Sequence, residues 1–316
     1  MSRNSRGAAV APPTGEPAGD YGPQGRAPWL DVDWREHQRW VSVDGQPLNT
    51  IELGQGPALL FVHGLSGCWA NWLEQLPVFA EDHRVVAVDL PGFGHSPMPA
   101  EEISMSGYAR LLDRLCEQLG IDAAAVVGNS MGGLIAAELA IAFPQRVERL
   151  VLVSAAGVST YGDPRTARAV PALRRLERIM LASGGWFAAK SDAVARYPRL
   201  RRAALSIVAA HPDRLPAALA AEQLRGAGKP GFVQALAAII DYNLRERFPE
   251  IACPTLIVWG AEDRLIGLRD ADVFEELIPD SRKVVFADTG HMSMLERPAA
   301  FNALLKDFLA ERPISA

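Results

Sequence analysis

The sequence predicts an α/β protein whose mostly parallel, twisted β-sheet is flanked by helices and interrupted by a helical insertion. Three observations predict this fold. Short apolar runs that suit strands buried on both faces alternate with longer segments of helical spacing. This alternation stops at 157–250 and then resumes. At 123–140 an apolar run breaks at glycine, presents one serine and continues as an alanine- and leucine-rich segment.

The composition is that of an ordinary globular protein. The chain has 316 residues, of which 49% are hydrophobic and 22% charged, and its formal net charge is −5. This length allows a large buried core, and nothing in the charge pattern indicates a nucleic-acid partner. The three cysteines, Cys68, Cys116 and Cys253, are odd in number and widely spaced, so neither a disulfide framework nor a metal site is expected.

Residues 1–28 are expected to form a disordered tail. They contain five glycines and five prolines and no hydrophobic periodicity, so burial cannot offset their ordering entropy. They also lack the apolar centre of a secretory signal, and no later stretch is long and apolar enough to span a bilayer. We therefore expect a cytoplasmic protein without stable membrane insertion.

The first strands lie on either side of a turn at Asp44 and Gly45. Extended runs at 38–43 and 48–53 flank this pair, which is a hairpin signal. Continuous apolar runs at 58–62 and 84–90 predict two buried strands. The first exits through a loop that begins with His63 and Gly64, and the second carries Asp89 near its end. At 106–119 apolar residues recur with helical spacing, which predicts a crossover helix.

The stretch from Gly128 to Gly132 reads Gly-Asn-Ser-Met-Gly, a G-x-S-x-G pattern between a strand and a helix. A turn this tight strains the backbone of its central residue, Ser130, and leaves no room for a β-carbon at 128 or 132. The turn lifts the Ser130 hydroxyl above the sheet edge. It also puts the amide of Met131 at a helix N-terminus, where it can face a developing negative charge.

A strand at 147–153 precedes the insertion at 157–250. Helical stretches are expected at 166–183, 192–210 and 230–246, separated by glycine and proline. The insertion holds 15 Lys and Arg against 8 Asp and Glu, a net charge of +7, whereas the rest of the chain carries −12. The basic face is either a solvated helical surface or a contact for anionic substrates or membranes.

The next strand is expected at 254–260, and the loop that follows it contains Glu262 and Asp263. Alternation along the strand directs Glu262 away from Asp263. A last strand at 283–286 leads into a loop that contains His291, and an amphipathic helix at 295–309 closes the domain.

From about residue 34 to 309 the chain resembles the α/β-hydrolase family. The resemblance rests on the G-x-S-x-G turn, the His-Gly loop, the G-x-x-D sequence that ends at Asp263, and His291 near the C-terminus. The resemblance implies an α/β-hydrolase core at 29–156 and 251–316, with a helical cap at 157–250. It gives His63 and Asp89 structural roles and makes Leu65 a backbone oxyanion donor. Asp263 is the expected acid partner of the histidine, with Asp163 as the rival.

The order Ser130, Asp263, His291 is that of α/β-hydrolases. A serine hydroxyl needs a base within hydrogen-bond reach, and the base needs an anion to fix its tautomer. We expect Ser130 to attack a carbonyl, His291 to move the proton and Asp263 to hold the ring. The amides of Leu65 and Met131 would stabilise the oxyanion. This chemistry requires neither a metal nor a cofactor.

The expected partner is a small-molecule ester with a small or medium apolar acyl group, cleaved by a carboxylesterase. Asn129, Trp69, Phe232 and Met292 are candidate substrate-binding residues. The Gly-Asn-Ser-Met-Gly-Gly sequence is also common in carbon–carbon bond hydrolases of vinylogous diketone acids, although Met292 stands where those enzymes usually have tryptophan. A thioesterase, a lactonase or a non-catalytic binding protein are further alternatives. The sequence leaves the oligomeric state open.

Overall fold

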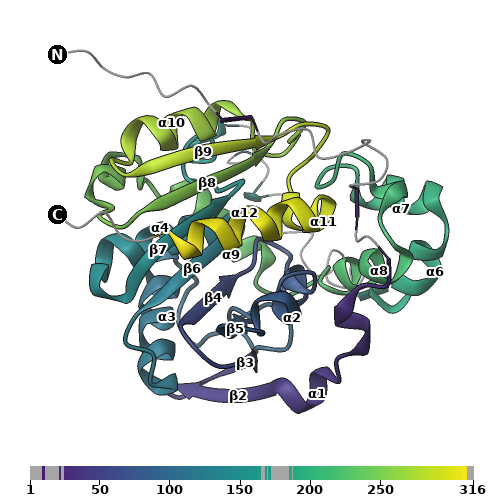
Figure 1. Ribbon diagram of the computed structural model, residues 1–316, viewed down its shortest axis with the longest axis horizontal. Coiled ribbons are helices and arrows are strands. Elements are labelled where there is room, and N and C mark those ends of the chain that lie inside the picture. Colours follow the sequence, from purple (N-terminus) through teal and green to yellow (C-terminus); the bar gives the residue numbers. More distant parts are fainter. Residues whose placement is uncertain are drawn as a thin grey trace.

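The computed structural model describes residues 9–10, 21–22, 25–164, 168, 170–171, 185–186 and 188–311. Within these residues, nine strands form one sheet in the order β1-β9-β8-β7-β6-β4-β5-β3-β2 (Figure 1). Strand β3 pairs antiparallel with β2 and β5, and the other neighbours are parallel. The strands are β1 (Ala9–Val10), β2 (Gln38–Val43), β3 (Gln46–Leu53), β4 (Ala58–Val62), β5 (Arg84–Val88), β6 (Ala124–Asn129), β7 (Val147–Val153), β8 (Thr255–Gly260) and β9 (Ser281–Phe286). The predicted α/β class with a mostly parallel sheet is confirmed.

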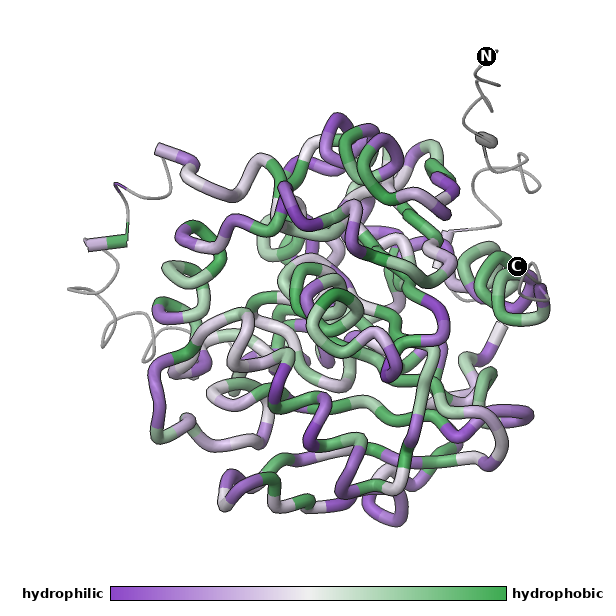
Figure 2. The backbone as a smooth tube through the Cα atoms, turned by 90° about the vertical axis from the view of Figure 1, so that its left-hand side faces the viewer, coloured by the Kyte–Doolittle hydropathy of each residue, from purple (hydrophilic) through white to green (hydrophobic). Residues whose placement is uncertain are grey.

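Helices cover both faces of the sheet, because alternate strand residues point to opposite sides. Leu60 and Val62 of β4 pack in one apolar cluster with α3 (Met105–Leu119), α4 (Met131–Ala142) and α10 (Arg269–Leu277). Leu59 and Phe61 pack in a second cluster with α2 (Leu76–Phe79), α11 (Ser293–Glu296) and α12 (Pro298–Ala310). Figure 2 shows hydrophobic stretches of the chain running through the interior of the molecule.

The expected hairpin joins β2 and β3. Asp44 and Gly45 have φ values of 50° and 84°, so both occupy the left-handed region that a tight hairpin turn requires. The first residues of the core, α1 (Trp34–His37) and the 3₁₀-helix η1 (Pro28–Asp31), precede this hairpin.

The segment between β7 and β8 contains α6 (Ser191–Arg196), α7 (Pro198–Leu205), α8 (Ala217–Arg225) and α9 (Phe232–Asp241). Helices α6, α7 and α8 share a small apolar core of their own and lie together at one end of the sheet (Figure 1). The single helix expected at 192–210 is two helices, because Pro198 cannot continue α6 and instead begins α7. Most of the helix expected at 166–183 lies outside the described residues.

The prediction of a disordered tail at 1–28 is wrong for those of its residues that the structure describes. Tyr21 and Ala27 are buried, and β1 pairs with β9. The physical reason is a specific partner that composition does not reveal: the Tyr21 hydroxyl donates a hydrogen bond to the buried carboxylate of Glu296. Within the described residues, no helix combines the length and the apolar character needed to cross a bilayer.

Candidate active site

The turn between β6 and α4 holds Ser130 in strained backbone geometry, with φ 55° and ψ −118°. A β-carbon on Gly128 would lie 2.2 Å from the carbonyl oxygen of Gly132, and one on Gly132 would lie 2.3 Å from that of Val62. The two glycines therefore allow the crossing of chain segments that the sequence pattern predicts. Met131 is the first residue of α4, so its amide has no acceptor within the helix.

The loop after β4 is braced by the imidazole ring of His63, which is fully buried. Its Nε2 accepts a hydrogen bond from the amide of Leu90 at 3.0 Å, so Nδ1 carries the proton and donates to the carbonyl oxygen of Gly64 at 2.8 Å. Burial lowers the pKa of His63, which favours this neutral form. The ring thus fixes the start of the segment that contains Leu65.

Asp263 and His291 form a buried pair at the ends of β8 and β9. His291 Nδ1 lies 2.8 Å from Asp263 Oδ2, and the two side chains are 3% and 0% exposed. The other carboxylate oxygen of Asp263 accepts hydrogen bonds from the amides of Leu265 and Ile266, both at 2.9 Å. These two amides fix the carboxylate, and the carboxylate fixes the imidazole ring.

The second nitrogen of the ring, His291 Nε2, is buried and has no hydrogen-bond partner among the described residues. His291 and Ser130 both belong to the wall of one cavity of about 680 Å³. A buried nitrogen without a partner is costly unless a reacting group or substrate uses it. The arrangement provides a base, oriented by an anion, beside a serine at a strained turn.

The cavity wall is mostly apolar. Leu65, Phe232 and Met292 contribute to it, and Asp163 and His291 are its only ionisable side chains among the described residues. Lysine and arginine are absent from this described part of the wall. The other apolar residues that the cap places in the cavity wall are Ala204, Leu205, Ile207, Val208, Leu224, Ala227, Leu236, Ile239 and Ile240.

Of the four candidate substrate-binding residues, Asn129, Phe232 and Met292 lie in the described cavity wall. Trp69 is absent from the described cavity wall, and its ring packs against Trp34 with centroids 5.0 Å apart. The Trp69 ring thus packs against a residue from the N-terminal side of the core. Asn129 does line the cavity, but its side-chain amide donates to the carbonyl oxygens of Val153 and His291.

The structure also brings the polar side chains of Asn71, which could line the pocket or anchor the next helix on the sequence alone, and of Gln223, which the sequence did not single out, to the cavity wall. Asn71, from the 3₁₀-helix η2 (Trp69–Trp72), donates to Gln223 of α8 at 2.6 Å, and Gln223 donates to the carbonyl oxygen of Ala70 at 3.1 Å. This contact joins the core to the cap across 152 positions of sequence. No local pattern marks such a pair, because each residue alone is an ordinary polar side chain.

Two other side chains near the site have structural environments. Asp89 is fully buried and accepts hydrogen bonds from the amides of Trp69 and His95, both at 2.8 Å. Burial raises the pKa of the Cys68 thiol to about 12, with a further contribution from the charge of Asp89. Cys68 is therefore a protonated thiol at neutral pH and a poor nucleophile.

The sheet order, the strained serine turn and the Asp263–His291 pair define a hydrolase architecture. A sequence model of the family described as "alpha/beta hydrolase fold" matches residues 57–298. The chain belongs to this α/β-hydrolase family.

Among curated relatives, the chain is 31% identical over 294 residues to the 2-hydroxymuconate semialdehyde hydrolase of Pseudomonas sp. strain CF600, covering 88% of this chain and 95% of that protein. It is 32% identical over 282 residues to the dihydrolipoyllysine-residue acetyltransferase component of the acetoin cleaving system of Cupriavidus necator H16, covering 86% and 68%. The solved structure titled "Est816 as an N-Acyl homoserine lactone degrading enzyme" superposes with a TM-score of 0.69 at 26% identity, covering 85% of this chain and all of that one.

Proposed function

We propose that this protein is a serine hydrolase that cleaves carboxylic esters of small or medium apolar acyl groups. The observation that carries the proposal is the buried His291 ring, which is held through Nδ1 by Asp263 and whose Nε2 has no hydrogen-bond partner among the described residues, in the wall of the cavity that Ser130 also lines. This is the relation of base, orienting anion and nucleophile that activates a serine hydroxyl.

In the proposed mechanism, Ser130 Oγ attacks the carbonyl carbon of the ester while His291 Nε2 takes the hydroxyl proton. The negative charge on the carbonyl oxygen is stabilised by the amides of Leu65 and Met131, each contributing roughly 2.7–4 kcal/mol. His291 then gives the proton to the leaving alcohol, and an acyl-enzyme remains on Ser130. Water, deprotonated by His291, attacks this acyl-enzyme and releases the acid.

The mostly apolar wall supports an uncharged substrate. A vinylogous diketone acid, the substrate class of the carbon–carbon bond hydrolases, carries a carboxylate that needs a cationic or strongly donating partner when it is buried. The described wall provides neither lysine nor arginine for this charge. Carbon–carbon bond cleavage nevertheless stays the second candidate, because the chain shares 31% of aligned residues with a semialdehyde hydrolase of this kind.

The test is steady-state turnover of p-nitrophenyl esters with two to twelve acyl carbons, compared between wild type and Ser130→Ala. We expect saturable turnover in the wild type, loss of at least about 10³-fold in kcat in the variant, and one optimal chain length set by the cavity. A vinylogous diketone acid and an acyl homoserine lactone are measured in parallel. A kcat/KM for either that exceeds the best ester by tenfold would replace the ester assignment.

A further inference from the structure

The carboxylate of Glu296, at the end of α11, holds the backbone on both sides of His291. Glu296 is fully buried. Its two oxygens accept hydrogen bonds from the amide of Gly290 at 3.0 Å, and Oε1 accepts one from the amide of Met292 at 3.3 Å. The residues immediately before and after His291 are therefore fixed by one side chain.

The same carboxylate binds two segments that lie far away in the sequence. The amide of Ala210, at the end of the cap segment that follows α7, donates to Oε2 at 2.8 Å. The hydroxyl of Tyr21 donates to the same oxygen, and the amide of Gly22 donates to the Glu296 carbonyl oxygen at 2.8 Å. Tyr21 is 275 residues from Glu296 and precedes the part of the chain that the family model matches.

The Tyr21 hydroxyl also accepts a hydrogen bond, from the amide of His211 at 2.9 Å. The hydroxyl therefore links the Glu296 carboxylate to the cap. The Tyr21 ring is itself held in place, since the His211 ring meets it edge-on at 5.5 Å and the guanidinium groups of Arg297 and Arg214 lie 5.2 and 5.8 Å from its centroid.

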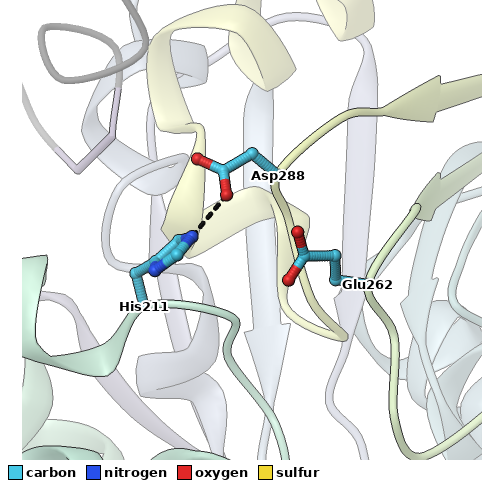
Figure 3. A group of neighbouring side chains, drawn as sticks. All are labelled: His211, Glu262 and Asp288. Carbon is cyan, nitrogen blue, oxygen red and sulfur yellow. Dashed lines mark hydrogen bonds and ion pairs between the residues drawn. The ribbon is translucent and has the colours of Figure 1, made fainter.

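The cap segment 208–211 runs along the loop that carries His291. The amide of His291 donates to the carbonyl oxygen of Val208 at 3.1 Å. The ring of His211 contacts the carboxylate of Asp288, and the side chain of Glu262 lies close to both (Figure 3). A shift of this cap segment would therefore shift the backbone of His291.

The hydrogen-bond donors around Glu296 favour the ionised form of its carboxyl group. Every group that the carboxylate contacts here is a donor, and an ionised carboxylate is an acceptor only. Burial raises the pKa of Glu296, and the amides of Ala210 and Gly290 together with the Tyr21 hydroxyl oppose this change. Burial and the neighbouring carboxylate also raise the pKa of Tyr21, so its hydroxyl stays protonated and donates.

We propose that Tyr21 is a positioning residue for His291. Its hydroxyl, held between Glu296 and the His211 amide, keeps the loop that carries His291 and the cap segment 208–211 in a fixed position relative to Ser130. This inference rests on the proposed hydrolytic function. Removal of the hydroxyl leaves the half-buried His211 amide without its acceptor and takes one donor from Glu296. The loop gains freedom, so His291 Nε2 spends less time where it can take the serine proton, whereas no side chain of the cavity wall is removed.

The first experiment compares Tyr21→Phe with Tyr108→Phe in the full chain. Tyr108 is a matched control, because its buried hydroxyl donates to the carbonyl oxygen of Pro91 at 2.7 Å and its helix α3 covers the other face of the sheet. We expect Tyr21→Phe to lower kcat at least fivefold with KM changed less than twofold, and Tyr108→Phe to keep kcat within twofold. A Tyr21→Phe kcat within twofold of wild type, or an equal loss in Tyr108→Phe, overturns the proposal.

The second experiment needs no turnover. Amide hydrogen exchange is measured by mass spectrometry on peptides that cover 286–297 and 205–212. We expect faster exchange in both peptides of Tyr21→Phe and wild-type exchange there in Tyr108→Phe. Exchange equal to wild type in Tyr21→Phe overturns the positioning role whatever the kinetics. Faster exchange in a protein that hydrolyses no ester refutes the proposed function but keeps the structural link.

Discussion

The side-chain amide of Asn129 donates a hydrogen bond to the carbonyl oxygen of His291, with a nitrogen–oxygen distance of 3.3 Å. The same amide donates to the carbonyl oxygen of Val153 at 3.1 Å. Because Asn129 directly precedes Ser130, this one group joins the serine turn to the histidine loop and to the end of β7. The segments that carry the candidate nucleophile and the candidate base are thus joined by a hydrogen bond, in addition to lining the same cavity.

Replacement of Asn129 by alanine tests this link. Two buried carbonyl oxygens would lose a donor, which costs about 1–3 kcal/mol of stability. We expect kcat for the best ester to fall by roughly tenfold with little change in KM, because the histidine loop is less well held. Asn302→Ala is the control, since that amide donates to the carbonyl oxygen of Glu74, away from the cavity wall described. An equal loss of kcat in both variants would contradict a specific role for Asn129.

The choice of acid is tested by comparing Asp263→Asn with Asp163→Asn. Asparagine at 263 can still accept from the amides of Leu265 and Ile266, but it no longer stabilises the charged imidazole or fixes its tautomer. We expect kcat to fall by about 10³–10⁴-fold for Asp263→Asn and by less than tenfold for Asp163→Asn. Steady-state kinetics at saturating ester gives both values. The reverse order of effects would make Asp163 the acid.

The serine turn is expected to tolerate no side chain at Gly128. A β-carbon there would lie 2.2 Å from a backbone carbonyl oxygen, whereas one at Gly267 would meet nothing within 4 Å. We expect Gly128→Ala to lose roughly 3 kcal/mol or more of unfolding free energy, because two backbone segments must separate. Gly267→Ala should change it by less than about 0.5 kcal/mol. Denaturant unfolding measures both, and equal stabilities would refute the steric account of the turn.

Glu74 gives a pH-dependent prediction for stability. Burial raises the pKa of its carboxyl, against the opposing hydrogen bond from Trp29 Nε1 at 2.7 Å. A carboxyl whose folded pKa lies above its unfolded value contributes stability at low pH that is lost as pH rises through the folded pKa. Glu74→Gln cannot ionise and keeps the acceptor for Trp29. We expect the variant to be more stable than wild type at pH 7 and this advantage to vanish near pH 4 in thermal denaturation, whereas a pH-independent difference would contradict the assignment.

Local spacing in the sequence predicts much of this fold. The apolar runs of β4 and β6, the Asp44–Gly45 turn and the glycines around Ser130 all act within a few residues, so their consequences can be derived without knowing the rest of the chain. The choice of Asp263 and His291 rests on the resemblance to the α/β-hydrolase family, and the structure shows that each follows a parallel strand, where such strands end at one edge of a sheet.

Contacts between distant segments could not be predicted in the same way. The Tyr21 hydroxyl finds Glu296, the Trp69 ring packs on Trp34, and Asn71 meets Gln223 only after the core, cap and N-terminal segment have come together. Tyrosine, tryptophan and asparagine in irregular segments carry no periodic signal. Their positions are set by tertiary packing, which overrides local preference.

The most direct test of the central claim, that Ser130 is the nucleophile, is covalent labelling with a fluorophosphonate, followed by mass spectrometry of the digested protein. We expect one adduct per chain, on the peptide that contains Ser130, with ester turnover lost in proportion to labelling and no adduct in Ser130→Ala. An adduct on another side chain, or full turnover in the protein labelled at Ser130, would contradict the account.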